Sequence, residues 1–178
     1  MSEITTDRLR LRAWRESDLA PWAAMNADPE VRRYFPDVLT HEQSAASIEH
    51  FQRDLDARGW GWWAVETRTD GQFVGFAGLD PVEDGLPISG VEVGWRLARS
   101  AWGHGYATEA GRACLAYGFD TLALPEIVAF TTTNNEGSLA VMRRLGMTHD
   151  PADDFDDPSW PEGPLRRTVV HRISRPRP

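Results

Sequence analysis

Alternating apolar and polar positions predict strands along much of this chain. In residues 6–13, three arginines alternate with two leucines and an alanine. Successive side chains of a strand point to opposite faces, so this pattern gives one buried and one solvated face. A turn at Thr69-Asp70-Gly71 predicts that the strands on either side of it form an antiparallel hairpin. The segments with strand character are 6–13, 60–67, 72–79, 91–97, 126–132 and 166–174.

Apolar residues spaced three and four apart predict helices between these strands. The longest should run from about Thr40 to Ala57, because Thr40 and Gln43 can form a capping box and Gly59 can end the helix. Further helices are expected over 16–26, over 28–34, after Gly105 with Ala107, Ala110, Cys114 and Tyr117 on one face, and from 134–138 to Gly146.

Residues 149–164 should form a long loop before the last strand. They hold five aspartates, one glutamate and four prolines, a composition that suits neither a helix nor a strand. The remaining helices alternate with strands, which favours an α+β (mixed α/β) fold with a twisted mixed sheet. A chain of 178 residues is the right size for a single domain, so we expect one domain over 1–178.

Composition excludes several classes of protein. Hydrophobic residues make up 41% of the chain, so it is not a disordered tail, and no apolar run is long enough to span a bilayer. The N-terminus has no signal-type segment, so we expect a cytoplasmic protein. One cysteine and five scattered histidines give no metal-ligand spacing, and we expect no metal. The formal net charge of −8 argues against nucleic-acid binding.

The segment from Val91 to Ala110 has the character of a strand, a glycine-bearing turn and a helix. The first N–H groups of a helix lack partners within it, and the helix dipole places positive charge there. Gly103 and Gly105 remove the Cβ atoms that would keep an anion from the main chain. The turn is therefore a candidate phosphate site. A dinucleotide fingerprint would need a third glycine where Thr108 stands, and the chain has no P-loop tripeptide.

The run from Trp102 to Ala110, after Glu92-Val93-Gly94-Trp95, resembles the GCN5-related N-acetyltransferase (GNAT) family, and in particular its Rim-type branch. The resemblance implies a central sheet splayed at its middle strands. It also implies that the turn binds the pyrophosphate of acetyl-CoA while the preceding strand pairs with the pantetheine arm. The wider family often has Gln or Arg where Ser100 stands. The coenzyme contacts implied are Trp95, Arg96, Leu97, Trp102, Gly103, His104, Gly105, Tyr106, Ala107, Thr108, Asn135 and Met142.

Two residues are the candidates for acid and base chemistry. Glu92 lies in a hydrophobic strand, where low dielectric would raise its pKa and favour a role as the base that deprotonates an amine. Its alternative is a structural ion pair with Arg96 on the same face. Ser138, in the segment Asn135-x-x-Ser138 of the Rim-type branch, is the candidate donor to the coenzyme thiolate, since Met142 has no proton to give. Its alternative is simple helix capping by Asn135 and Ser138.

These predictions describe an acetyl-CoA-dependent N-acetyltransferase. Its acceptor would be a primary amine, either a protein or peptide N-terminus or a small molecule such as an antibiotic or polyamine, and a non-catalytic acyl-CoA sensor is the alternative class. The resemblance also implies that backbone N–H groups of Trp95 to Leu97 hold the oxyanion. A homodimer through the sheet or the long loop is left open. Acceptor contacts are expected from Tyr34, Phe35, Trp60 and the 80–88 loop.

Overall fold

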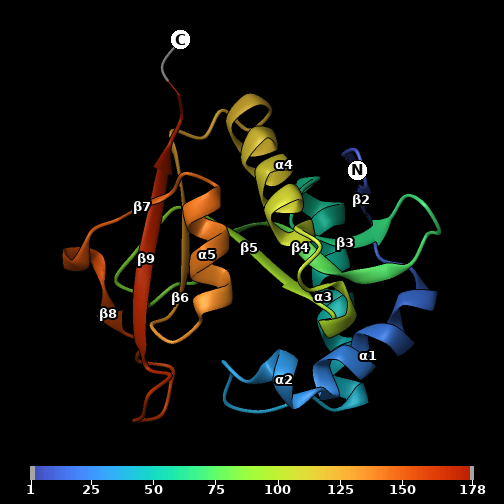
Figure 1. Ribbon diagram of the computed structural model, residues 1–178, viewed down its shortest axis with the longest axis horizontal. Helices are drawn as coiled ribbons and strands as arrows, with labels where there is room; N and C mark the ends of the chain where they lie inside the picture. The colour runs from blue at the N-terminus through green and yellow to red at the C-terminus, as the bar shows by residue number, and fades with distance from the viewer. Residues whose placement is uncertain (1–2, 177–178) are drawn as a thin grey trace.

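The computed structural model describes residues 3–176, which form one nine-stranded sheet with helices on both faces (Figure 1). The strand order is β1-β2-β3-β4-β5-β6-β9-β7, with β8 paired to β9. All neighbours are antiparallel except β5 and β6. The strands are β1 Ile4–Thr5, β2 Leu9–Arg12, β3 Trp62–Thr67, β4 Phe73–Pro81, β5 Val91–Leu97, β6 Glu126–Thr132, β7 Thr148–His149, β8 Phe155–Asp156 and β9 Arg167–Ser174.

Within residues 3–176, five α-helices flank this sheet. The α4 and α5 helices follow β5 and β6, and α1, α2 and α3 come from the long connection between β2 and β3 (Figure 1). The N-terminus of α3 is closed by the predicted capping box of Thr40 and Gln43, and the helix ends at Gly59. The helices are α1 Leu19–Ala27, α2 Pro29–Arg32, α3 His41–Arg58, α4 Tyr106–Asp120 and α5 Glu136–Arg144.

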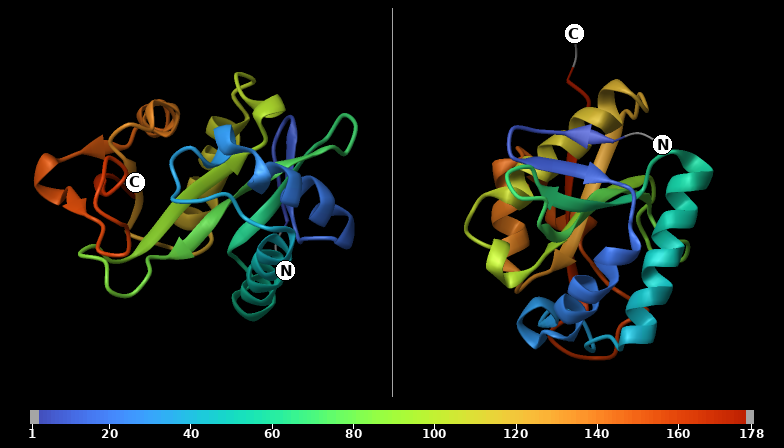
Figure 2. Two further views of the ribbon diagram at one scale, coloured as in Figure 1. Left: turned by 90° about the horizontal axis from the view of Figure 1, so that it is seen from below. Right: turned by 90° about the vertical axis from the view of Figure 1, so that its right-hand side faces the viewer.

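The sheet is splayed between β5 and β6. The β4 and β5 strands are paired along seven residues, whereas β5 and β6 meet only at Glu92 and Val128. Beyond that point the two strands diverge, and β5 crosses between an N-terminal and a C-terminal half of the molecule (Figures 1 and 2). The divergence leaves the edge of β5 from Val93 onward without a strand partner on that side.

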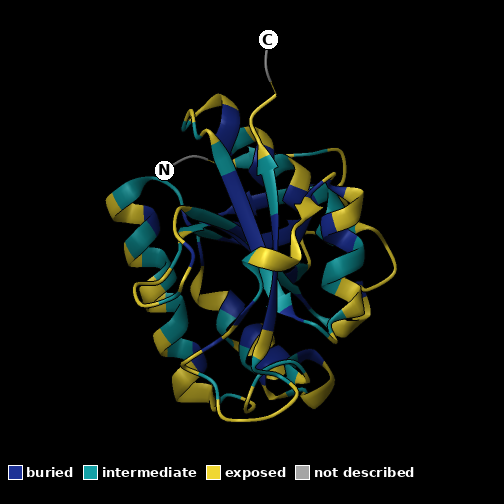
Figure 3. Ribbon diagram, turned by 90° about the vertical axis from the view of Figure 1, so that its left-hand side faces the viewer, coloured by how far each residue is buried: buried dark blue, intermediate teal, exposed yellow. Residues whose placement is uncertain are grey.

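The hydrophobic core joins the central strands to α1, α3 and α4. Buried positions concentrate along the inner strands, and exposed positions lie on the outer surfaces of the helices and in the loops (Figure 3). Trp22 and Trp63 are fully buried in this core, as is Cys114 of α4. Burial raises the pKa of the Cys114 thiol, which agrees with a packing role. In the described part of the chain, no helix is both long and apolar enough to cross a membrane.

Two predictions about secondary structure were wrong. The expected strand over 6–13 is shortened to β2, Leu9–Arg12, and the separate strand β1 precedes it, because Thr6 and Leu9 form a turn in which the Thr6 N–H donates to the Leu9 carbonyl at 2.9 Å. The expected loop over 149–164 contains a 3₁₀ turn at Pro151–Asp153 and the short strand β8. Backbone pairing with β9 supplies this order, which local composition does not encode.

Candidate active site

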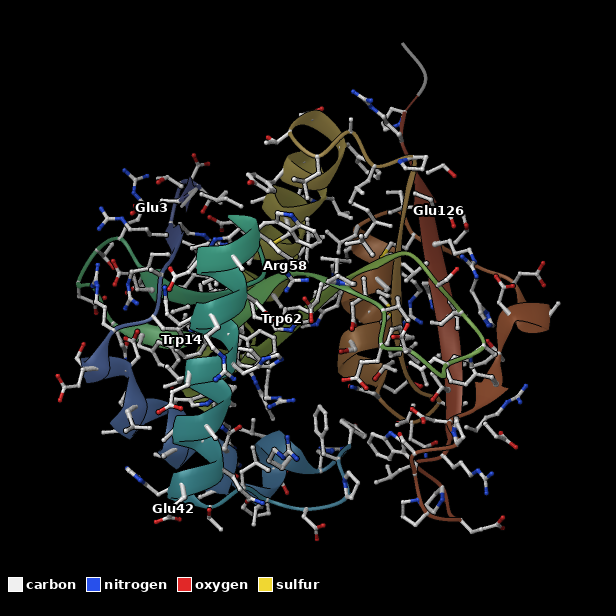
Figure 4. All side chains as sticks on the ribbon, turned by 180° about the vertical axis from the view of Figure 1, so that it is seen from behind. Glu3, Trp14, Glu42, Arg58, Trp62 and Glu126 are labelled. Atoms are coloured by element: carbon white, nitrogen blue, oxygen red, sulfur yellow. The ribbon has the colours of Figure 1, made fainter. Side chains whose placement is uncertain are left out.

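A cleft of about 1660 Å³ occupies the opening between the two halves of the sheet. One wall is formed by β5, the turn that follows it and the first part of α4, and the opposite wall by the end of β6 and by α5. The segment after α2 and the loop before β9 also contribute to the lining. Except for Glu126, the side chains labelled in Figure 4 lie in the N-terminal half of the molecule, with Trp62 nearest its centre. The predicted coenzyme-binding and catalytic residues all line this one cleft.

The glycine turn leads into α4 with its backbone open to the cleft. Gly103 and Gly105 both have φ of +78°, in the left-handed region that glycine adopts without strain. Gly105 is the N-cap of α4, and no side chain caps the helix there. Helix N-terminal N–H groups without a cap offer hydrogen bonds and positive potential to an anion. The cationic residues Arg8, Arg112 and Arg144 also line the cleft, although the chain as a whole is acidic.

Arg8 fixes this turn to the loop between β1 and β2. Its guanidinium contacts the Glu109 carboxylate at 2.6 and 2.7 Å and donates to the His104 carbonyl at 2.9 Å. Thr6 donates its hydroxyl to the same carboxylate at 2.6 Å. Despite partial burial, these hydrogen bonds and the Arg8 charge hold the pKa of Glu109 below its usual value. Through these contacts, Arg8 and Thr6 fix the position of the glycine turn from the loop between β1 and β2.

We expect Arg8→Gln to weaken acetyl-CoA binding by about tenfold, or roughly 1.4 kcal/mol. The variant loses both the fixing contacts to His104 and Glu109 and a cation beside the open helix terminus. The measurement is the dissociation constant by calorimetry. Arg167→Gln is the matched control, since Arg167 is equally exposed at 50% but lies on β9 and pairs with Asp156. Equal affinities for the two variants would contradict a role for Arg8 in the turn.

The β5 strand carries different side chains on its two faces. Trp95 points toward α4, where its ring atoms lie 3.5 Å from the position that a Cβ on Gly111 would take. Arg96 points away from α4 and lies over Phe35. The main chain between these faces is the unpaired edge left by the splay. At the end of the strand, Trp102 donates its indole N–H to the Leu97 carbonyl at 2.9 Å.

Glu92 lies on the same face of β5 as Gly94 and Arg96. Burial is the main cause that raises the pKa of Glu92 to about 8, and the nearby Asp80 and Glu83 carboxylates add to it. A Cβ on Gly94 would lie 2.8 Å from the Trp62 ring and 4.0 Å from a Glu92 oxygen, so the Trp62 indole lies directly over this part of the strand. No ion pair joins Glu92 to Arg96 within residues 3–176, so the structural alternative for Glu92 is not observed.

Comparison with known proteins gives this cleft its context. A sequence profile for the GNAT acetyltransferase domain matches residues 8–148. The chain belongs to the GNAT acetyltransferase family. The uncharacterized protein YkkB of Bacillus subtilis (strain 168) is 32% identical over 149 residues, covering 82% of this chain and 85% of YkkB.

Solved structures agree on the acetyltransferase fold. A GNAT-family acetyltransferase from Bacillus anthracis superposes with a TM-score of 0.82 at 22% identity, covering 98% of this chain and 99% of that one. RimL, a ribosomal L7/L12 alpha-N-protein acetyltransferase in complex with coenzyme A, gives 0.77 at 17% identity, covering 97% and 98%. At these identities the likeness concerns the fold. The predicted mixed α/β fold with a splayed central sheet is therefore confirmed.

The start of α5 brings Ser138 into the cleft of this acetyltransferase. Asn135 is the N-cap, and its side-chain oxygen accepts the Ser138 N–H at 3.2 Å while its amide donates to Thr131 at 2.9 Å. The Asn135 part of the capping interpretation is thus correct, whereas the Ser138 side chain takes no part in the cap. Met142 is 2% exposed and packs at the base of the cleft wall.

Most of the residues expected to contact the acceptor line the cleft. Tyr34, Phe35 and, from the 80–88 loop, Glu83 and Leu86 line the cleft as expected. Trp60 does not, because it packs against the core beneath the Arg58 guanidinium at 4.8 Å. Trp63 is fully buried in the core, whereas Trp62 both contacts the core and lines the cleft.

Three contributors to the acetyltransferase site were not singled out from the sequence. Arg8 and Glu109 meet across 101 positions of the chain, a contact that only the folded structure shows. Arg112 lies four residues after Thr108 on α4, so helical periodicity could have predicted that both side chains line the cleft beside the glycine turn. Among the residues that the structure describes, no cluster of three or more His, Cys, Asp or Glu side chains is placed to hold a metal ion.

Proposed function

We propose that this acetyltransferase binds acetyl-CoA along the open edge of β5 and transfers the acetyl group directly to a primary amine. The observation that carries the proposal is the placement of an uncapped helix terminus and a carboxyl group of raised pKa at two parts of one cleft. Backbone N–H groups of residues 103–108 would bind the diphosphate, and the main chain of Trp95 to Leu97 would pair with the pantetheine arm.

Glu92 is the proposed base. Bound acetyl-CoA supplies an activated thioester, and the amine nitrogen forms the new C–N bond as the C–S bond breaks. Glu92 accepts the proton that the ammonium must lose before attack, directly or through one water. Backbone N–H groups at Trp95 to Leu97 stabilise the negative charge that develops on the carbonyl oxygen.

Ser138 is the proposed proton donor to the departing sulfur. Its hydroxyl lines the cleft, and no hydrogen-bond partner for it is found within the described residues. A thiolate of pKa near 8.5 leaves more readily when a hydroxyl donates to it. The second proton that the attacking nitrogen loses then returns to the Ser138 hydroxyl through water. Met142, deeper in the same wall, contributes packing alone.

The acceptor class has two candidates, and the first is a protein or peptide N-terminus. The likeness to RimL supports it, although that likeness is one of fold. An α-amine with a pKa near 8 also needs less help from a base than a lysine side chain. The second candidate is a small-molecule amine, which the aromatic lining of Trp62 and Phe35 beside Arg96 favours.

A continuous assay of free coenzyme A tests the proposal most broadly. The purified chain is mixed with acetyl-CoA and a panel of polyamines, amino acids, aminoglycosides and short peptides with free N-termini. We expect steady thiol release with at least one amine and equimolar acetylated product. Tight acetyl-CoA binding without turnover across the panel would instead support the non-catalytic acyl-CoA sensor.

A further inference from the structure

The part of the cleft between Glu92 and Arg96, which we call the acceptor side, has opposite charges at its two ends. Glu92 and Glu83 lie at the end near the start of β5, and Arg96 lies four residues further along the same strand. Residues 92, 94 and 96 share one face of the strand, and Gly94 leaves the space between the two charged side chains to the Trp62 indole. An acceptor that lies in the cleft beside the Trp62 indole therefore meets a carboxyl group at one end and a guanidinium at the other.

The Arg96 guanidinium is surrounded by aromatic rings. Its Cζ atom lies 4.2 Å from the centre of the Phe35 ring, 5.4 Å from that of Phe76 and 5.7 Å from that of Trp22. Its one hydrogen bond runs from Nη1 to the Asn26 side-chain oxygen at 3.3 Å. Asn26 is in turn fully buried and donates to the Ser44 hydroxyl. The side chain is thus held in a fixed direction by neutral partners.

Nothing in the described part of the chain neutralises this charge. Arg96 forms no ion pair, its Nε atom is shielded from solvent without a hydrogen-bond partner, and the charged group that acts on it most is another cation, Arg32. Burial, followed by this repulsion, lowers the pKa of Arg96 to about 9. Unpaired buried charge is costly, so a guanidinium that lines a ligand cleft is well suited to an anion brought by the ligand.

The coenzyme does not supply that anion from the phosphate turn. Arg96 faces away from α4, whereas the turn leads directly into α4 and has Arg8 beside it. The main chain of Arg96 lies on the donor path, but its side chain lies on the acceptor side. At position 96 the backbone therefore serves the coenzyme, and the side chain serves the acceptor.

We propose that Arg96 binds a carboxylate of the acceptor, so that the substrate is an amine that also carries an acidic group. This inference rests on the proposed function and specifies its substrate class. Four residue steps along the strand place the Cα atoms of Glu92 and Arg96 roughly 13 Å apart, and the two long side chains can reach into this distance. The amine and the carboxylate of the substrate are therefore several bonds apart. An ω-amino acid has this chemistry, and so does a peptide N-terminus with an acidic residue at the second or third position.

The test compares matched acceptors that differ only in charge. One arm uses ω-amino acids from β-alanine to 6-aminohexanoate with their carboxamides. The other uses C-terminally amidated tripeptides with Asp or Asn at the second or third position. For the wild type we expect kcat/KM at least about tenfold higher for the acid of the preferred pair, the scale of one charge-assisted hydrogen bond. The arm that shows the preference identifies the source of the carboxylate.

Substitutions assign the preference to Arg96. In Arg96→Gln the ratio of acid to amide should fall to near one, and Arg96→Lys should retain part of it. The affinity for acetyl-CoA should stay within about twofold, because the main chain and not the side chain pairs with the donor. Arg167→Gln is the control: Arg167 lies on β9, pairs with Asp156 and is outside the cleft lining. It should keep the wild-type ratio.

The outcomes separate this inference from the proposed function. Turnover of amines with no acid used tenfold better than its amide would overturn the role of Arg96 and leave the acetyltransferase intact. An undiminished preference in Arg96→Gln would overturn it as well. Absence of acetyl-CoA binding by the wild type would instead remove the proposed function itself.

Discussion

Glu92→Gln lowers kcat with a preferred amine by about 100-fold or more near neutral pH, the usual contribution of a positioned general base. Glutamine keeps the shape of the side chain but cannot accept a proton. The measurement is steady-state kinetics with acetyl-CoA at saturation. Calorimetry should show that the variant still binds acetyl-CoA. A kcat within about threefold of the wild type would show that the proton of the amine passes to water or to the acceptor itself and not to Glu92.

The pH dependence gives a sharper form of the same prediction. Because the pKa of Glu92 is raised to about 8, its carboxyl is mostly protonated at pH 7 in the free enzyme, and kcat/KM should rise with pH up to about 8. Glu92→Gln should lack this step. Glu83→Gln removes a repelling charge and should move the step to lower pH. Two acceptors with different amine pKa values distinguish the enzyme's step, which stays in place, from the substrate's.

Folding stability should respond in the opposite direction to activity. A carboxyl whose pKa is raised by folding binds more protons in the native state than in the unfolded state, so its effect becomes destabilising as pH rises from about 4.5 to 8. Glu92→Gln should therefore be more stable than the wild type by at least about 1 kcal/mol at pH 9. The difference should shrink toward pH 5. Urea unfolding at both values measures it, and a variant that is less stable at pH 9 would contradict the burial of the charge.

Arg12→Met destabilises the fold by about 3 kcal/mol or more, because it leaves the buried Asp18 carboxylate without a cation and removes from Glu66 the one buried guanidinium among its three partners. Arg12 donates to both oxygens of Asp18 at 2.7 and 2.8 Å and to Glu66 at 2.5 Å. All three residues are 4% exposed or less. This cluster joins β2, β3 and the start of α1. Urea denaturation at pH 7 is the measurement.

Arg10→Met is the matched control for this prediction. Arg10 lies two positions before Arg12 on the same strand and contacts the same Glu66 carboxylate at 3.2 Å, but its side chain is 43% exposed. Exposed ion pairs contribute up to about 1 kcal/mol, so the free energy of unfolding of this variant should fall by no more than that. Equal losses from the two substitutions would show that burial does not set the strength of the cluster. Replacing Asp18 with Asn and Glu66 with Gln in the Arg12→Met background should recover part of the loss.

Much of the fold follows from local patterns in the sequence. The predicted strand 126–132 coincides with Glu126–Thr132 and lies beside β5, and the predicted hairpin is formed by β3 and β4. These segments combine clear periodicity with local turn or capping signals, so the sequence determines them at short range. Strand β8 has no such signal, since two residues in an acidic, proline-rich stretch become ordered only by pairing with β9.

The residues of the site also divide into those that the local sequence predicts and those that tertiary structure places. The glycine turn and Glu92 could be predicted because their chemistry lies within one contiguous strand-turn-helix segment. Arg8 reaches that turn from the other end of the sequence, so its contact with Glu109 depends on tertiary structure. Alternation predicts that Trp62 and Trp63 point to opposite faces, but only the packing of Gly94 and α4 decides which ring faces the cleft. The environment of Arg96 depends on packing in the same way.

The central claim is that backbone N–H groups at the start of α4 hold the coenzyme diphosphate and thereby place the thioester beside Glu92. Calorimetric titration of acetyl-CoA into the wild type, Gly103→Ala and Gly71→Ala tests it most directly. Both glycines have positive φ, +78° and +69°, with nothing within 4 Å of the added Cβ, so the two variants carry similar backbone strain. The account predicts that Gly103→Ala binds about tenfold more weakly, or roughly 1.4 kcal/mol, while Gly71→Ala matches the wild type. A wild type that gives no binding heat, or two variants with the same affinity, would contradict it.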